Sequence, residues 1–328
     1  MPLHARCLAA ATIVIFAAGC DKAKPAGGAR GSAEAAEAAR SAVPQLDLST
    51  RPDILFQVFG ERDDPRMIPV AAIRDGTLLP IELSNTGWRR FDGMYLRSGT
   101  TYTLYHDGMQ AGSVSVRQGM WEKADDPLYS LAKCEQLVPL ASVAVTGVPS
   151  SSYTIEYFAS GARLGKQVAG QSMPPADVAA TAKRIGYALG KAEEISQSTL
   201  DSLDFRAVAL PTGATSRPTI IASFIDPSAG GGDANGGESA HVFAIADAKG
   251  GSAYTVTFDH VVKDPTSPRA EYRRYVDHLD LDGNGVDEII LEGWQEAGKT
   301  YLIILSYREG KWQETFRGRS SWCLDAKG

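Results

Sequence analysis

Residues 101–117 read TYTLYHDGMQAGSVSVR, and this stretch decides the fold class of the first half of the chain. Polar residues alternate with β-branched or aromatic ones in 101–106 and again in 113–117, a pattern typical of half-buried strands. Between the two runs, Asp107-Gly108 is a residue pair that favours the tight turn of a β-hairpin. The stretch therefore predicts two antiparallel strands joined by that turn.

Similar signals occur on the N-terminal side of this hairpin. Residues 54–59, 69–73 and 78–83 are short apolar runs, and Asp75-Gly76 precedes the last of them as a second hairpin turn. We therefore expect residues 48–150 to form an N-terminal domain, either a small antiparallel β-barrel or a sandwich.

The segment 176–195 has a different period. Its apolar residues recur at steps of three and four, and Pro174-Pro175 suits the first turn of a helix. The pattern predicts one amphipathic helix. The residues that carry it are Val178, Ala182, Ile185, Leu189 and Ala192.

Strand patterns return between residues 205 and 316, with turn residues at near-regular spacing, and they predict an antiparallel meander. The runs are 206–210, 219–225, 241–246, 254–262, 272–278, 288–292, 301–307 and 312–316. We expect residues 151–328 to form a C-terminal domain that begins with a strand at 153–158 and contains the helix and this meander. The fold class is therefore mainly β, of the α+β kind.

The first nineteen residues have the layout of a secretory signal peptide, with one Arg, an apolar run from Cys7 to Ala18, and Ala17-Ala18-Gly19 before Cys20. Twelve apolar residues would make a helix of about 18 Å, which is too short for the roughly 30 Å hydrocarbon core of a membrane. We expect cleavage directly before Cys20.

A cysteine after such small residues resembles the lipobox of bacterial lipoproteins. The resemblance implies that Cys20 carries palmitate-type acyl chains and anchors the protein in a membrane, with its folded part in the cell envelope outside the cytoplasm. Residues 20–47 are rich in Ala, Gly, Glu and Arg and predict a flexible tether. Two questions stay open: whether the anchor is in the inner or the outer membrane, and whether Cys20 is a chance cysteine after an ordinary signal peptide.

The net charge and the cysteines bear on the possible partners of the protein and on disulfide formation. The chain has 33 Lys plus Arg against 39 Asp plus Glu, a net charge of −6, which argues against nucleic acid as a partner. Of its four cysteines, Cys134 and Cys323 remain once Cys7 is removed and Cys20 is lipidated. We expect them to form a disulfide in an oxidising compartment; two buried thiols are the alternative.

Residues 280–288 read DLDGNGVDE and predict a calcium-binding loop. Asp280, Asp282 and Asn284 occupy positions 1, 3 and 5, the backbone carbonyl of Val286 is available at position 7, and Glu288 stands at position 9. Ca²⁺ takes six to eight oxygen ligands, which a tight loop of this kind can supply. Strand patterns on both sides exclude an EF-hand, in which helices flank the loop.

This context resembles the calcium-binding hairpins of FG-GAP and VCBS-type repeats. The resemblance implies that Asp280, Asp282, Asn284, the Val286 carbonyl and Glu288 bind Ca²⁺, while the neighbouring aspartate at position 8 points to solvent or lies behind the ligands. The motif occurs in one convincing copy, so a full propeller is not expected. The alternative is an Asp- and Gly-rich turn that binds nothing.

Two further motifs carry no function in our interpretation. Residues 293–300, GWQEAGKT, match the P-loop expression, but a strand pattern follows where a helix is required, so we predict a hairpin turn and no nucleotide. Ser130-Leu-Ala-Lys133 matches a penicillin-recognising motif without its companion motifs.

We therefore expect a noncatalytic, lipid-anchored envelope protein with one Ca²⁺ site, whose partner is a protein or a glycan. The alternative is an envelope hydrolase with catalytic carboxylates that the sequence does not identify. A concave pocket holding two carboxylates, or a carboxylate and a histidine, would favour the hydrolase.

Overall fold

The computed structural model describes residues 46–121, 139–165, 172–226, 240–250, 253–264, 270–295 and 300–318. The chain divides into two compact units, Met1–Pro44 and Gln45–Gly328, and all described residues belong to the second. Cys20, Cys134 and Cys323 lie outside the described residues, so the lipid anchor and the disulfide stay predictions. Among the described residues, no helix is both long and apolar enough to cross a membrane.

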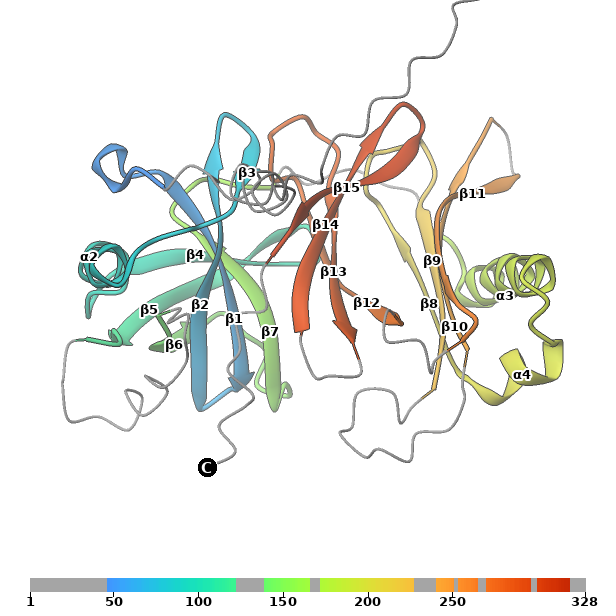
Figure 1. The fold of residues 1–328 in the computed structure, drawn as a ribbon, viewed down its shortest axis with the longest axis horizontal. Helices are drawn as coiled ribbons and strands as arrows, with labels where there is room; N and C mark the ends of the chain where they lie inside the picture. Colours follow the sequence, from blue (N-terminus) through green and yellow to red (C-terminus); the bar gives the residue numbers. More distant parts are fainter. Residues whose placement is uncertain are drawn as a thin grey trace, which may run out of the picture. The chain divides into compact units, whose positions relative to one another are not determined.

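The N-terminal part is a closed β-barrel (Figure 1). Its sheet runs in the order β1-β7-β4-β5-β6-β2-β3, and β1 also pairs with β2, so six strands close on themselves and β3 extends β2. Of the two predicted architectures, the barrel is the one found. The strands are β1 (Asp53–Glu61), β2 (Asp64–Arg74), β3 (Thr77–Leu79), β4 (Thr101–His106), β5 (Met109–Gln118), β6 (Ala141–Thr146) and β7 (Thr154–Ser160).

Strand β7 is the strand that we expected at the start of the C-terminal domain. It pairs with β1 on one side and β4 on the other, so it belongs to the barrel, which runs to Ser160. Without β7 both neighbours would present an unpaired edge, and closure removes such edges.

Both predicted Asp-Gly turns are confirmed. Asp75-Gly76 joins β2 to β3 and Asp107-Gly108 joins β4 to β5. All four residues have positive φ, between 48° and 72°, as the tight hairpin turn requires.

Helix α2 (Asn85–Tyr95) was not predicted, and the strand expected at 78–83 ends at Leu79. Ser84 caps the helix, because its side chain accepts a hydrogen bond from the backbone N–H of Gly87. Trp88 and Phe91, three residues apart, face the barrel core and are buried.

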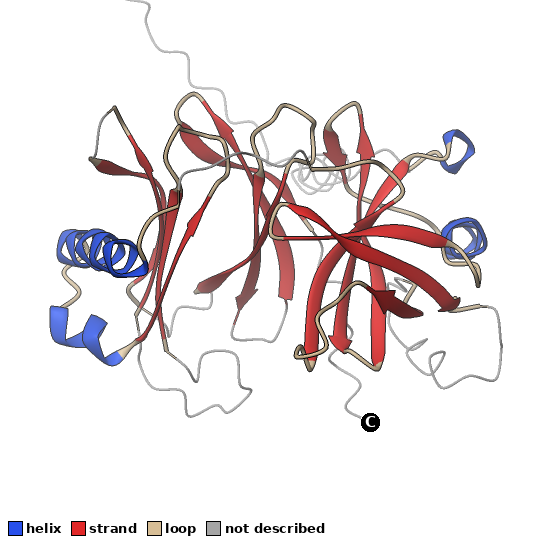
Figure 2. Ribbon diagram, turned by 180° about the vertical axis from the view of Figure 1, so that it is seen from behind, coloured by secondary structure: helices blue, strands red, loops and turns tan. Residues whose placement is uncertain are grey.

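The C-terminal part contains the predicted helix and two antiparallel meanders instead of one (Figure 2). The first meander packs against the helix through the cluster around Phe224. The elements are α3 (Pro175–Ala192), α4 (Gln197–Ser202), β8 (Asp204–Leu210), β9 (Thr219–Ile225), β10 (His241–Ala248), β11 (Tyr254–Val262), β12 (Glu271–Leu279), β13 (Glu288–Gln295), β14 (Thr300–Arg308) and β15 (Lys311–Arg317). Thr300 begins a strand, which agrees with the rejection of a P-loop.

Apolar clusters hold these elements together in layers. One cluster joins the barrel to the β12–β15 sheet and includes Phe158 and Ile290. Another joins the β12–β15 sheet to the β8–β11 sheet and includes Phe243 and Ile289. The β12–β15 sheet therefore lies between the barrel and the β8–β11 sheet, as Figures 1 and 2 show.

Candidate metal centre

The predicted calcium loop connects β12 to β13, and the last register pair before it is Leu279 with Glu288. The two strands are antiparallel neighbours, so the hairpin context expected for the loop is present. The loop thus starts on a strand that packs against the barrel and ends on its neighbour in the same sheet.

Three of the predicted ligands come together. One carboxylate oxygen each from Asp280, Asp282 and Glu288 lies within 4.8 Å of the others. Asp280 and Glu288 are buried, with exposed fractions of 2% and 3%, and Asp282 is half-buried. This geometry suits a cation that binds the three carboxylates together, with the half-buried Asp282 on the side open to solvent.

Asn284 lies in the same loop but does not belong to that carboxylate cluster. Its Nδ2 donates to Asp282 Oδ2 at 2.9 Å, and its Oδ1 accepts from the backbone N–H of Val286 at 2.7 Å. Asn284 therefore holds the Asp282 carboxylate through a hydrogen bond, and its own amide oxygen already accepts one hydrogen bond.

Backbone donors shape the loop around Asp280. Its Oδ1 accepts from the Gly283 N–H at 2.7 Å and its Oδ2 from the Gly285 N–H at 3.1 Å. Both glycines have positive φ, +77° and +85°, a conformation that other residues rarely adopt. Because each carboxylate oxygen has two lone pairs, Asp280 can still bind a cation.

The charge state of Glu288 depends on what occupies the loop. Burial raises the pKa of its carboxyl to about 8, and the Asp282 and Asp280 carboxylates also raise it, against the Leu281 N–H and the Ser306 hydroxyl, which lower it. Without a cation, Glu288 therefore holds a proton at neutral pH, and a cation would replace that proton.

Of the two places expected for Asp287, in solvent or behind the ligands, the structure shows the buried one. It is only 2% exposed, and burial followed by repulsion from Asp280 and Asp277 raises its pKa to about 7. Its Oδ1 has no hydrogen-bond partner among the described residues. His278, on β12, has one ring nitrogen, Nδ1, in a hydrogen bond with Tyr275 Oη at 2.8 Å, while its Nε2 lies 3.6 Å from Asp287 Oδ2 without a hydrogen bond.

Two segments from outside the β12–β13 hairpin contact the loop and hold its position. Gly76, in the β2–β3 turn, packs so closely that a Cβ there would lie 2.9 Å from the Asp282 carbonyl oxygen. The Gly165 N–H donates to the Asp280 carbonyl oxygen at 3.2 Å. The loop is therefore part of the contact between the barrel and the β12–β15 sheet.

Two cavities adjoin the loop. The larger, about 640 Å³, is lined by Gly76, Arg163, Leu164, Gly165, Asp280, Leu281, Asp282 and Gly283. The smaller, about 40 Å³, includes Asp282 and Glu288 in its lining and has room for a water molecule or an ion, but not for an organic substrate. Since each of the predicted ligands offers an oxygen atom, these residues fit a hard cation such as Ca²⁺.

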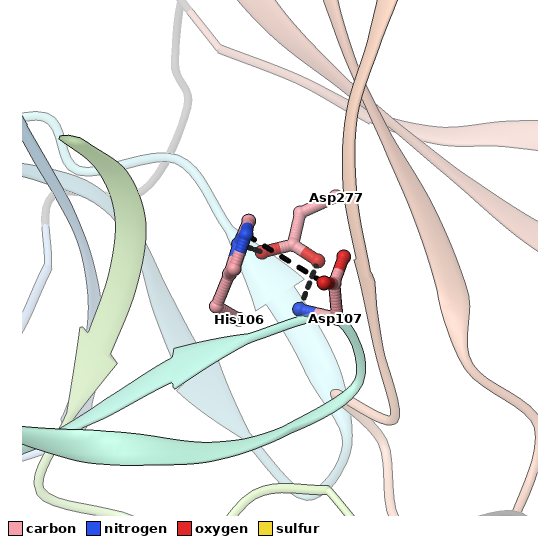
Figure 3. A group of neighbouring side chains, drawn as sticks. All are labelled: His106, Asp107 and Asp277. Atoms are coloured by element: carbon pink, nitrogen blue, oxygen red, sulfur yellow. Dashed lines mark hydrogen bonds and ion pairs between the residues drawn. The ribbon is translucent and has the colours of Figure 1, made fainter. Parts of the chain in front are cut away.

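Sequence reasoning missed a second group, His106, Asp107 and Asp277, which the structure brings together (Figure 3). His106 and Asp277 are 171 positions apart, so no local motif connects them. The only available signal was the position of His106 beside a hairpin turn.

Comparisons with family models, with curated proteins and with solved structures found no significant match to this chain. The functional argument therefore depends on the geometry of these residues.

Proposed function

We propose that the protein is a noncatalytic, lipid-anchored component of the cell envelope, in which Ca²⁺ bound by residues 280–288 fastens the C-terminal sheet to the barrel. Supporting this most directly is the convergence of the Asp280, Asp282 and Glu288 carboxylates within 4.8 Å in a loop pinned by Gly76 and Gly165. Asn284 and the Val286 carbonyl complete the proposed ligand set.

The electrostatics of the loop favour a bound Ca²⁺. Asp280, Asp287 and Glu288 are buried within one short segment, and buried carboxylates are stable only when protonated, hydrogen-bonded or paired with a cation. A bound Ca²⁺ would neutralise them together. Because barrel segments contact the same loop, neutralisation would also strengthen the contact between the two layers.

The proposed partners follow from the anchor and the larger cavity. Acylated Cys20 would hold the protein at a membrane, and the tether of residues 20–47 would let the folded part stand away from the lipid. The cavity of about 640 Å³ has the size of an ordinary ligand pocket and is open beside the loop, so a glycan or protein side chain is the expected occupant.

The hydrolase remains a second candidate, because Asp280 and Asp282 both line that cavity. A hydrolase needs one carboxyl group that holds a proton where substrate can reach it. Glu288, whose pKa is raised, instead lines the cavity of about 40 Å³, too small for a substrate. The noncatalytic function is therefore preferred.

Thermal unfolding of the full-length protein in detergent tests the calcium proposal. At about one hundred times its Kd, Ca²⁺ should add roughly 2.7 kcal/mol to the free energy of unfolding, so the melting temperature should rise with Ca²⁺ and fall with chelator. Mg²⁺ should do less, since it requires a tighter octahedron.

The double variant Asp280→Asn/Asp282→Asn should lose this dependence. The double variant Asp63→Asn/Asp64→Asn is the matched control, because it removes the same charge from the β1–β2 turn, where both residues are exposed. If the wild type melts identically with and without Ca²⁺, the loop is only a turn and the proposed function fails.

A further inference from the structure

The contact between His106 and Asp277 joins the barrel to the β12–β15 sheet (Figure 3). His106 ends β4, and its Nδ1 lies 3.1 Å from Asp277 Oδ2 on β12. An ionised carboxylate can only accept, so the ring nitrogen donates this hydrogen bond. The other oxygen, Asp277 Oδ1, accepts from the Asp107 backbone N–H at 2.9 Å. One carboxylate of the sheet therefore holds two consecutive residues of the barrel hairpin.

Burial makes the Asp277 carboxylate dependent on the groups that touch it. Its side chain is 2% exposed, and no Lys or Arg pairs with it among the described residues. His278, the second histidine beside it, lies 3.9 Å from Oδ1 and uses its Nδ1 in the hydrogen bond with Tyr275 Oη. In the described part of the chain, His106 is therefore the side chain that both donates to Asp277 and can carry a positive charge. A buried carboxylate is more stable beside a cation than beside neutral donors alone.

Charged and titratable groups from three elements surround the His106 ring. The hydrogen bond to Asp277 raises the pKa of His106 above its ordinary value of 6.5, burial lowers it, and the nearby carboxylates raise it. Asp107 is exposed to water, which screens its charge, and Glu156 is already paired with Arg274. Asp277 therefore has the strongest effect on the ring. The groups that face it are Asp277 and His278 on β12, Asp107 in the β4–β5 turn, and Glu156 and Tyr157 on β7.

We propose that His106 and Asp277 form a pH-sensitive latch between the barrel and the β12–β15 sheet, tight when His106 is protonated and weaker when it is neutral. Both forms of the ring can donate through Nδ1, but only the protonated form neutralises the buried carboxylate. Because the pKa of His106 is raised in the folded protein, the latch contributes fully below the ordinary value of 6.5, and this contribution is lost as pH rises through the folded pKa. The latch lies outside loop 280–288 and does not depend on bound Ca²⁺.

Hydrogen bonds alone could hold the two layers together at every pH, so the variants must separate charge from hydrogen bonding. In His106→Asn, the asparagine amide can occupy the place of Nδ1 and donate to Asp277, but it cannot take up a proton. Asp277→Asn removes the negative charge and keeps an oxygen that can accept from the Asp107 N–H. Its matched control is Asp107→Asn, the same change on a side chain that is 69% exposed.

An NMR titration of the full-length protein in detergent and chelator, with its histidines labelled with ¹³C at Cε1, measures the pKa of His106. The signal that disappears in His106→Asn identifies the residue. In the wild type this pKa should lie above 6.5. Asp277→Asn should lower it most, because burial then acts without the neighbouring charge, whereas Asp107→Asn should lower it less.

Urea unfolding in chelator, from about pH 5.5 to 9, measures the effect on stability. The unfolding constant of the wild type, divided by that of His106→Asn, should rise with pH by about tenfold for each unit by which the measured pKa exceeds 6.5. Other titrating groups, including Glu288, are present in both proteins and cancel in this ratio. Asp280→Asn/Asp282→Asn should keep the rise, so that failure of the calcium proposal leaves the latch intact. A wild-type pKa of 6.5 or below, or a ratio that does not change with pH, would overturn the proposal and leave a plain hydrogen bond.

Discussion

At the scale of single residues, burial of carboxyl groups decides the chemistry of loop 280–288. Glu288 lies 97% buried beside two other carboxylates, and its pKa is raised from an ordinary value of 4.5 to about 8. Such a residue holds either a proton or a shared cation, because an uncompensated charge there is too costly. The proton and the cation therefore compete for the same oxygens.

This competition predicts a pH dependence with a definite sign. Below pH 8, Ca²⁺ must displace the proton of Glu288, so the apparent Kd should fall about tenfold per unit as pH rises from 6.5 toward 8, for one proton released. Calorimetry in buffers of different ionisation enthalpy counts that proton. Glu288→Gln should bind Ca²⁺ more weakly and with a smaller slope, because Asp287, whose pKa is raised to about 7, still titrates in the same loop. An equal Kd at pH 6.5 and 8 for the wild type would contradict the prediction.

The same pKa makes an opposite prediction for the calcium-free protein. Folded Glu288 keeps its proton up to about pH 8, while the unfolded chain loses it near the ordinary value of 4.5. Between these values the folded state binds more protons, so this residue's contribution to stability decreases as pH rises. In chelator, urea unfolding should therefore show a smaller decrease from pH 5 to pH 8 for Glu288→Gln than for the wild type.

At the scale of elements, the β2–β3 turn of the barrel fixes the calcium loop. Gly76 has φ +72°, and a Cβ there would meet Asp282, whereas Gly310 in the β14–β15 turn has φ +77° and open space around it. Replacing either glycine by alanine should lower the free energy of unfolding by roughly 1–2 kcal/mol, because alanine disfavours the left-handed backbone conformation. Gly76→Ala should lose more stability than Gly310→Ala in urea unfolding, and it alone should weaken Ca²⁺ binding. Equal losses and equal Ca²⁺ affinity would show that the turn does not position the loop.

Local signals predicted some elements well. The two hairpins depend on their Asp-Gly turns, and helix α3 depends on the period of one amphipathic stretch. Each of these signals lies within a single short segment of the sequence. Closure of the barrel by β7 and the division of the last eight strands into two sheets depend on pairing between distant segments, which periodicity does not specify.

A bulge explains why the His106–Asp277 contact could not be predicted. In regular alternation Val276 and Asp277 would face opposite sides of β12. The register shifts between Tyr275 and Asp277, and as a result Val276 packs in the cluster shared with the barrel while Asp277 also bonds to barrel residues. The proposed calcium ligands, by contrast, can be predicted as a group because one nine-residue loop carries them all.

At the scale of the whole molecule, the proposed calcium site and the His106–Asp277 contact lie where the β12–β15 sheet meets the barrel. Loop 280–288 contacts Gly76 and Gly165, and Asp277 contacts His106 and the Asp107 backbone. An apolar cluster already joins these layers, so a bound Ca²⁺ would add to an existing contact. Loss of Ca²⁺ should therefore loosen the contact between the layers before it unfolds them.

In our proposal, acylated Cys20 fixes the position of the folded part in the cell and so determines which partners the proposed site can meet. A single acyl chain gives marginal membrane binding, whereas several chains, as the lipobox resemblance implies, give stable anchoring. Cells grown with an alkyne fatty-acid analogue should label the wild type, and the labelled protein should sediment with membranes. Cys20→Ser should take up no label, because the acylated sulfur is gone.

Cys7→Ser is the matched control for this substitution. It makes the same change thirteen positions earlier, inside the apolar run that the signal peptidase should remove, so label and membrane association should be unchanged. If Cys20→Ser takes up as much label as the wild type, the lipid is attached elsewhere or nowhere specific. The tether of residues 20–47 would then begin at an ordinary cleavage site, and the calcium loop would work in a protein that is free to diffuse.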